Sequence, residues 1–116
     1  LVARSSGALA WVVQRVTAAG LVVLLAVHIW FLHYRDPGEV IAMESVAARL
    51  RGPVFLAVDL ALLALALFHG LNGVRNVLLD YGVGGNAARL LEWGLWLAGV
   101  AFFLYGAYAL TPFVLG

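Results

Sequence analysis

The segment HGLNGVRNVLLDY, residues 69–81, places polar side chains inside a run that otherwise has the composition of a membrane-spanning helix. At about 100° per residue in an α-helix, four residues project within roughly 60° of His69 and form a stripe with it. They are Asn72, Gly73, Asn76 and Asp80. Polar groups in a bilayer are costly and usually face a cavity, a cofactor or another helix. We therefore expect the stripe to point into a helix bundle, with Gly70 and Gly73 allowing a bulky group to approach the backbone.

The composition around this segment is that of an integral membrane protein. The 116 residues are 65% hydrophobic and only 11% charged, and the formal net charge is +1. So small a net charge argues against a nucleic-acid surface. The sequence contains no cysteine, which excludes disulfides, cysteine-ligated zinc and iron–sulfur ligation by these residues. The first residues lack the pattern of a cleaved signal peptide, and we expect a short tail that enters the first helix.

Three apolar runs are long enough, or nearly so, for the roughly 20 residues that cross a bilayer. We predict an all-α fold in one domain, residues 1–116, with transmembrane helices at about 10–33, 53–81 and 88–113. The segment between the first two, residues 34–52, mixes apolar and charged residues at 39–50 and predicts a short interfacial helix. Three spans put the two chain ends on opposite sides of the membrane.

Glycine and proline mark the expected boundaries of these helices. A turn at residues 35–38 ends the first helix, and Gly52 and Pro53 separate the interfacial helix from the second. The glycine-rich residues 82–86 predict a flexible turn. Thr111 and Pro112 are expected to end the third helix.

A charged residue lies one or two turns inside each of the first two predicted spans. Arg15 sits about one turn inside the first, where it either snorkels to the interface or pairs with an anion. Asp59 lies some two turns inside the second, and reaching the near interface is favoured over pairing with a partner group. Because the first helix starts on the side where the second ends, we expect Arg15, Arg75, Asp80 and Tyr81 to cluster at one interface.

The three histidines differ in what their positions suggest. His69 precedes Asp80 by 11 residues, about 16 Å along a helix, which puts it near the midplane of a core of roughly 30 Å. It is either a hydrogen-bonded core residue or a haem ligand, since an axial imidazole with an arginine nearer the interface suits a haem. For His28 the alternatives are a hydrogen bond between helices and metal or haem ligation. His33 reads as an interfacial histidine.

Two sequence motifs carry a resemblance to a known family. His69, Asn72, Gly73 and Arg75, followed by Asp80 and Tyr81, resemble the second-helix signature of the cytochrome b membrane-anchor subunits of succinate dehydrogenase and fumarate reductase, respiratory complex II. The run at residues 14–18, QRVTA, is similar to the motif that opens their first helix. The resemblance covers two of the three helices in the expected order. It leans toward the D-type anchor, with the C-type as the alternative.

The resemblance implies roles for individual residues. His69 matches the axial ligand of the haem b nearer the iron–sulfur subunit, and a companion anchor subunit would supply the second ligand. Tyr81 matches the tyrosine that hydrogen-bonds the quinone, with Asp80 its neighbour and Arg15 close to the propionates and the quinone pocket. His28 has the spacing of a second, distal haem ligand in two-haem members. The haem count stays open, with one favoured over two.

The function implied is that of a haem- and quinone-binding anchor in a bacterial or archaeal cytoplasmic membrane, with its N-terminus in the cytoplasm. Electrons would come from a partner iron–sulfur subunit, itself joined to a flavoprotein subunit, and pass to quinone. We expect no succinate site and no catalytic residue in this chain. The alternative is a haem-free anchor that only docks the soluble subunits to the membrane. A small multidrug-type transporter is disfavoured, because the first helix carries no acidic residue.

Overall fold

The computed structural model describes residues 7–35, 38 and 40–115. Three long helices dominate it: α1 (Gly7–Ile29), α3 (Pro53–Asp80) and α4 (Gly85–Leu115). Each is long and apolar enough to cross a membrane, α1 together with the π-helical segment η1 (Trp30–Tyr34). The all-α fold with three candidate spans, predicted from the sequence, is confirmed.

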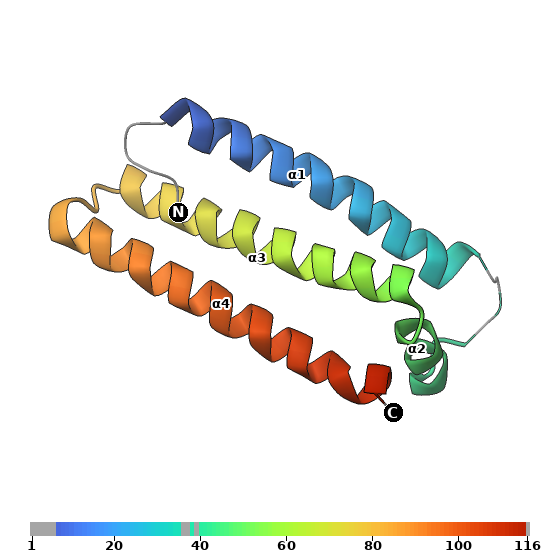
Figure 1. Ribbon diagram of the computed structural model, residues 1–116. Coiled ribbons are helices and arrows are strands. Elements are labelled where there is room, and N and C mark those ends of the chain that lie inside the picture. Colours follow the sequence, from blue (N-terminus) through green and yellow to red (C-terminus); the bar gives the residue numbers. More distant parts are fainter. Residues whose placement is uncertain (1–6, 36–37, 39, 116) are drawn as a thin grey trace.

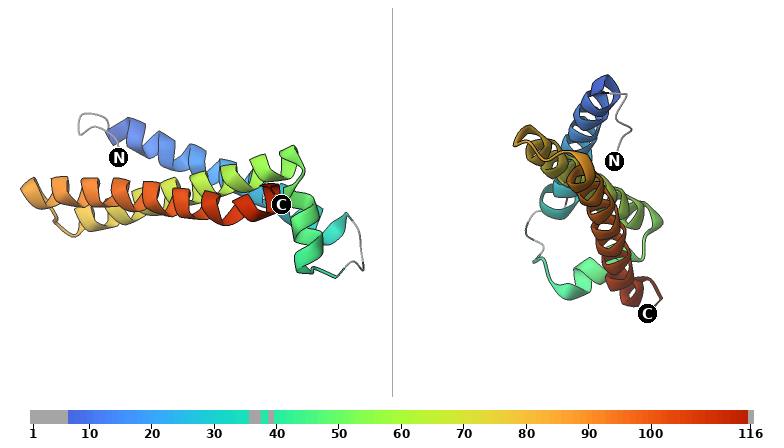
Figure 2. Two further views of the ribbon diagram at one scale, coloured as in Figure 1. Left: turned by 60° about the horizontal axis from the view of Figure 1, so that its bottom comes forward. Right: turned by 90° about the vertical axis from the view of Figure 1, so that its left-hand side faces the viewer.

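The long helices lie side by side as a layer with α3 in the middle (Figure 1). Helix α3 packs against both α1 and α4, whereas α1 and α4 make no contact with each other in the described part of the chain. The layer is 52 Å long, and Figure 2 shows the helices crossing at shallow angles. Helix α3, which carries the polar stripe, is therefore covered on two sides and open on the remaining two.

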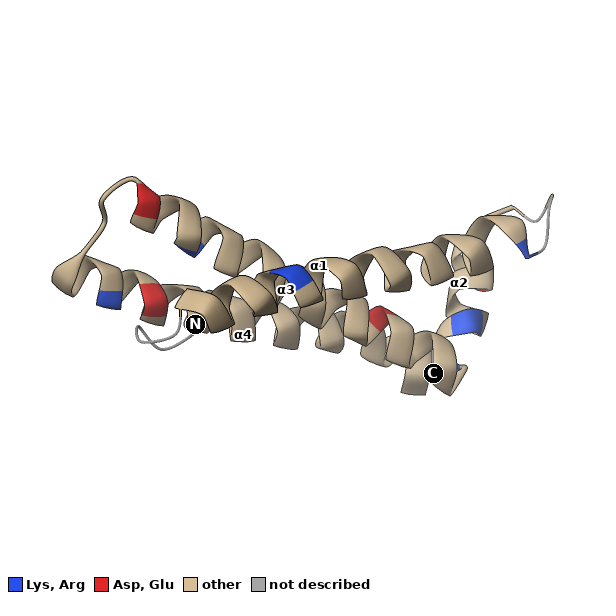
Figure 3. Cartoon of the chain, turned by 90° about the horizontal axis from the view of Figure 1, so that it is seen from above, with Lys and Arg blue, Asp and Glu red and all other residues tan. Residues whose placement is uncertain are grey.

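Few side chains are buried in this arrangement. Among the described residues only Leu50, Thr17 and Asn72 fall in the buried class. Large apolar side chains along all three long helices are exposed, as expected for a surface in contact with lipid or with other membrane subunits. Figure 3 shows that charged residues are sparse along these helices. The two polar residues in the buried set, Thr17 and Asn72, both lie between α1 and α3.

The short helix α2 (Met43–Leu50) confirms the helix predicted between the first two spans. Ser45 Oγ accepts a hydrogen bond from the Ala42 backbone N–H at its N-terminus. Helix α2 packs across the ends of α3 and α4, and Leu50 is its buried contact. At the neighbouring end of the first span the helix widens into η1, where Phe31 meets Phe55 of α3 edge to face at 4.9 Å.

The turn between α3 and α4 is a helix C-terminal motif built on Gly82. The N–H of Gly82 donates to the carbonyl of Leu79 and that of Val83 to Leu78, which is the Schellman pattern. Gly82 adopts φ +92°, a conformation that favours glycine. Helix α4 then starts at Gly85, inside the segment 82–86 that the sequence analysis assigned to the turn and three residues before its expected start.

The prediction that Pro112 ends the last helix is wrong, because α4 continues to Leu115. Proline has no N–H to donate to the carbonyl four residues before it, which here is that of Tyr108. Thr111 Oγ1 donates a 2.7 Å hydrogen bond to that same carbonyl. A side-chain hydroxyl thus satisfies the acceptor that proline leaves open, and the helix is not forced to end.

Small residues let α4 approach α3 closely. A β-carbon on Gly106 would lie 2.6 Å from Leu63 Cδ2, and one on Gly99 would lie 3.0 Å from Leu71 Cδ1. At Gly94, by contrast, an added β-carbon would meet nothing within 4 Å. On the other side of α3, Gly20 of α1 gives the same close approach to Leu65.

Candidate functional site

The polar stripe of α3 meets the start of α1 at His69. The imidazole Nδ1 of His69 lies 3.1 Å from Thr17 Oγ1, across the seam between the two helices. Thr17 is 8% exposed, and the His69 ring is partly buried. The predicted inward orientation of His69 is therefore confirmed, with α1 as the neighbour it faces.

Gln14, one turn before Thr17, bridges the same seam. Its amide Nε2 donates to the backbone carbonyl of His69 at 3.3 Å, and its Oε1 accepts from Asn72 Nδ2 at 2.7 Å. Gly73 permits this contact, because a β-carbon there would lie 3.4 Å from Gln14 Nε2. Gln14 and Thr17 thus hold α3 through side chains on one face of α1.

Asn72 is fully buried, with no exposed surface, and its Oδ1 accepts no hydrogen bond from any described residue. An unsatisfied buried acceptor costs about 1–3 kcal/mol. The amide lies one turn from His69 on the same face of α3. Oδ1 is therefore a point where a donor from outside the described chain, such as a water or a bound group, would be stabilised.

The surroundings of His69 fit an imidazole that binds a large planar group. Its Nε2 has no hydrogen-bonding partner among the described residues, since the ring makes its contact through Nδ1. The adjacent Gly70 is exposed, and a β-carbon there would meet nothing within 4 Å. The described residues contain no cluster of three or more metal-ligating side chains, so a metal here would need a macrocycle or a partner subunit to complete its coordination.

His28 forms a second polar contact between α1 and α3, nearer the α2 end. Its Nδ1 lies 2.9 Å from Asp59 Oδ1. This is the hydrogen bond between helices that was one of the two alternatives for His28. It also corrects the favoured expectation for Asp59, which pairs with a helix partner because α3 turns the carboxylate toward α1. His33 is exposed in η1.

Arg15 lies on a different face of α1 from the residues that touch α3. It projects about 100° from Gln14 and 160° from Thr17. Its guanidinium sits 4.7 Å from the ring centroid of Trp11, a cation–π contact one turn away on the same helix. The exposed Arg15 is thus presented outward from the α1–α3 seam.

The four residues expected to cluster at one interface are spread along the helices. The Gln14–Asn72 contact puts Arg15 level with the middle of the stripe, whereas Asp80 lies eight residues beyond Asn72, about 12 Å along α3. Arg75 Nε is 3.9 Å from Glu92 Oε1 of α4. Only Asp80 and Tyr81, both exposed at the end of α3, share one location. The expected single cluster is therefore wrong, because α1 begins earlier than predicted, at Gly7.

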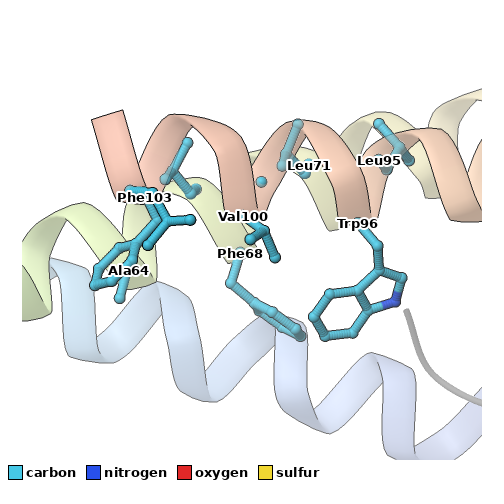
Figure 4. Close-up of a pocket in the computed structure, with 10 residues that line it drawn as sticks. Ala64, Phe68, Leu71, Leu95, Trp96, Val100 and Phe103 are labelled. Carbon is cyan, nitrogen blue, oxygen red and sulfur yellow. The ribbon is translucent and has the colours of Figure 1, made fainter. Parts of the chain in front are cut away.

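An apolar pocket of about 260 Å³ lies between α3 and α4 (Figure 4), and its lining residues on α3 lie at positions 64–71, the stretch that contains His69. Ala64, Phe68 and Leu71 line it from α3, and Trp96 and Val100 are among its residues from α4. It contains no side chain able to ligate a metal or exchange a proton. The pocket is therefore separate from the contacts of Gln14, Thr17 and His28, which lie on the α1 side of α3.

The fold and these contacts define a small helical membrane protein whose inter-helix contacts carry histidine, threonine and amide groups. The family described as "Succinate dehydrogenase/Fumarate reductase transmembrane subunit" matches residues 1–109. The chain belongs to this family, and the resemblance seen in the sequence is confirmed.

Three curated relatives show how far the similarity extends. The succinate dehydrogenase hydrophobic membrane anchor subunit of Archaeoglobus fulgidus is 30% identical over 88% of this chain and 86% of its own length. That of Halobacterium salinarum is 33% identical over 90% of this chain and 85% of its own. A succinate dehydrogenase 2 membrane subunit SdhC of Mycobacterium tuberculosis is 30% identical over 84% and 70%. Two of these relatives are named as hydrophobic membrane anchor subunits and one as SdhC, so the names do not distinguish a D-type from a C-type anchor for this chain.

Proposed function

We propose that this chain is the haem b- and quinone-binding membrane anchor of a succinate:quinone oxidoreductase, with His69 Nε2 as an axial ligand of the haem iron. The observation that carries the proposal is the arrangement of His69 itself. Thr17 engages Nδ1, so the ring is held at the α1–α3 seam while Nε2 has no partner in the described chain. Metal-ligating histidines commonly use their other ring nitrogen for a hydrogen bond in this way.

The open sides of the helix layer support a partner subunit. Because α1 and α4 do not contact each other in the described chain, the long helices cannot enclose a macrocycle, and His69 supplies one ligand at most from this seam. We propose that a companion anchor subunit covers this side and contributes the second axial ligand. An iron–sulfur subunit, joined to a flavoprotein subunit, would dock at the membrane surface. The bound haem would supply one-electron redox chemistry near the bilayer midplane.

Quinone binding is proposed at the end of α3. Tyr81 follows Asp80 directly, and the Tyr81 side chain is 84% exposed, so its hydroxyl is available to a ligand arriving from the lipid or from a partner surface. Tyr81 would donate a hydrogen bond to a quinone carbonyl, with Asp80 beside it as a proton-exchanging group. Arg15 lies about 12 Å nearer the midplane by register. Arg15 can contribute to the quinone site only through a bound group that extends along the roughly 12 Å between them by register, such as the haem propionates.

The test of the proposal is the substitution His69→Ala in the assembled complex. We expect the low-spin b-type spectrum, measured as a reduced-minus-oxidised difference with a pyridine haem assay, to be lost or strongly shifted. His33→Ala is the matched control, because His33 is exposed and lies in η1. It should leave the spectrum unchanged. An unchanged spectrum in an assembled His69→Ala complex would refute the ligand assignment.

The same spectrum separates the proposal from its alternative, a haem-free anchor that only docks the soluble subunits. Such an anchor would show no stoichiometric b-type haem in the purified wild-type complex. The arrangement of His69 supports the proposal over this alternative, since a purely structural His69 would leave Nε2 without a partner in the described chain.

A further inference from the structure

Thr17 has one hydroxyl proton and three neighbouring groups that compete for it. Its Oγ1 lies 2.8 Å from the carbonyl oxygen of Val13, 3.1 Å from that of Gln14, and 3.1 Å from His69 Nδ1. The two carbonyls can only accept. The Thr17 hydroxyl donates its proton to the carbonyl of Val13, which is the nearest acceptor. A hydrogen bond of this kind, to the carbonyl four residues earlier, is common for threonine within helices. Oγ1 then faces His69 with its lone pairs.

We infer that Thr17 is the positioning residue of His69: it accepts a hydrogen bond from Nδ1–H and thereby holds the ring in the tautomer whose Nε2 is bare. This inference rests on the proposed function, since a bare Nε2 matters when it ligates iron. The tautomer of a histidine is set by the hydrogen bond that its other nitrogen makes. Thr17 touches no reacting atom and would act only through His69.

The position of Thr17 makes it an effective orienting group. The side chain is 8% exposed, and a β-branched residue in a helix has few χ1 rotamers. Gln14 lies one turn earlier on the same face of α1, and its side-chain amide donates a hydrogen bond to the backbone carbonyl of His69. The backbone and the ring of His69 are thus fixed by two side chains of α1, which limits rotation of the imidazole about its own axis.

The chain offers an internal comparison in His28. There the acceptor facing Nδ1 is the carboxylate of Asp59, whereas at His69 it is a neutral hydroxyl. A carboxylate partner increases the electron donation of an imidazole to a metal more than a neutral acceptor does, because its charge stabilises the developing positive ring. Thr17 is therefore expected to orient His69 and to increase its electron donation only moderately.

The test uses Thr17→Val in the assembled complex, since valine keeps the shape of threonine and lacks the hydroxyl. We expect the haem dissociation constant to rise about 10- to 100-fold, the range found when such outer hydrogen bonds are removed. The haem reduction potential should also shift upward, because a weaker imidazole donor stabilises ferric iron less. Thr17→Ser restores the hydroxyl and should restore both values.

Thr111→Val is the matched control, because Thr111 also back-bonds to its own helix but lies on α4. It should change neither haem affinity nor potential. If Thr17→Val matches the wild type in both, the inference is overturned. If His69→Ala loses the haem while Thr17→Val does not differ from the wild type, only the inference fails. If the His69→Ala complex keeps the wild-type spectrum, both the proposed function and this inference fail.

A second measurement needs no variant that could fail to assemble. In the full wild-type chain without haem, ¹⁵N-histidine resonances report which ring nitrogen carries the proton. We expect His69 to be protonated at Nδ1 and bare at Nε2. A proton on Nε2 would mean that Thr17 donates to the ring, and the inference would then be wrong whatever the variants show.

Discussion

His28 and Asp59 form a 2.9 Å hydrogen bond between Nδ1 and Oδ1, eleven residues along α1 from the Thr17–His69 contact. At 1.5 Å per residue the two contacts are separated by about 16 Å. A single iron therefore cannot be held by both His28 and His69 of one chain. Thr17 and His28 nevertheless share one face of α1, and both contact α3.

His28→Ala in the assembled complex is expected to leave one haem in place and to lower stability. Removing the imidazole leaves the Asp59 carboxylate without its partner, and a lost hydrogen bond to a charged group costs about 1.5–3 kcal/mol. Haem per complex and thermal stability in detergent are the two measurements. Asp59→Asn, which retains a hydrogen-bonding side chain, should destabilise less. A wild type with two haems that falls to one in His28→Ala would contradict this and establish His28 as a distal ligand.

Tyr81→Phe should slow quinone reduction while the ring stays in place. The loss of one hydrogen bond is worth ~0.5–1.5 kcal/mol, roughly a two- to tenfold decrease in rate. Succinate oxidation with an artificial acceptor should persist, because that reaction does not use the quinone site. Tyr105→Phe is the control, since Tyr105 is an exposed tyrosine of α4. If Tyr81→Phe retains both activities at the wild-type level, the donor to quinone is elsewhere.

Gln14 and Asn72 should show energetic coupling in a double-mutant cycle. The Gln14 Oε1–Asn72 Nδ2 bond is 2.7 Å long and lies between α1 and α3. Inter-helix hydrogen bonds in membrane proteins are worth on average about 0.6 kcal/mol, with values up to ~1.7. We expect coupling in this range when Gln14→Leu, Asn72→Leu and the double variant are compared by unfolding in detergent. Strictly additive effects would show that the bond does not join the two helices in the membrane.

Gly106→Ala is expected to destabilise the contact between α3 and α4. The added β-carbon would lie 2.6 Å from Leu63 Cδ2, so the leucine or the helix must shift. Overpacking of this kind typically costs about 1–3 kcal/mol. Gly94→Ala is the matched control, because nothing lies within 4 Å of its added carbon, and alanine there should be neutral or slightly stabilising. A melting temperature equal to that of Gly94→Ala would show that α4 adjusts without cost.

The amino-acid sequence was sufficient to predict the number, type and approximate position of the helices. Long apolar runs can satisfy their backbone groups in a bilayer only as helices, so α1, α3 and α4 follow from composition and length. Gly52 and Pro53 likewise marked the start of α3 correctly. The ends of α4 were predicted less well, because the Thr111 hydroxyl compensates for Pro112 and a glycine at position 85 was compatible with a helix start.

The tertiary structure decided which polar groups meet. Helical periodicity shows that Asn72 shares a face with His69, but it cannot show that Gln14 and Thr17 are the groups opposite, because that depends on the axial register between two helices distant in sequence. The same register turns Asp59 toward His28 and separates Arg15 from Asp80. One residue of axial offset is about 1.5 Å, and hydrogen bonds fail over smaller distances than that. The sequence thus determined that His69 lies on a polar stripe within the second span, and packing of α1 on α3 determined that Thr17 is its partner.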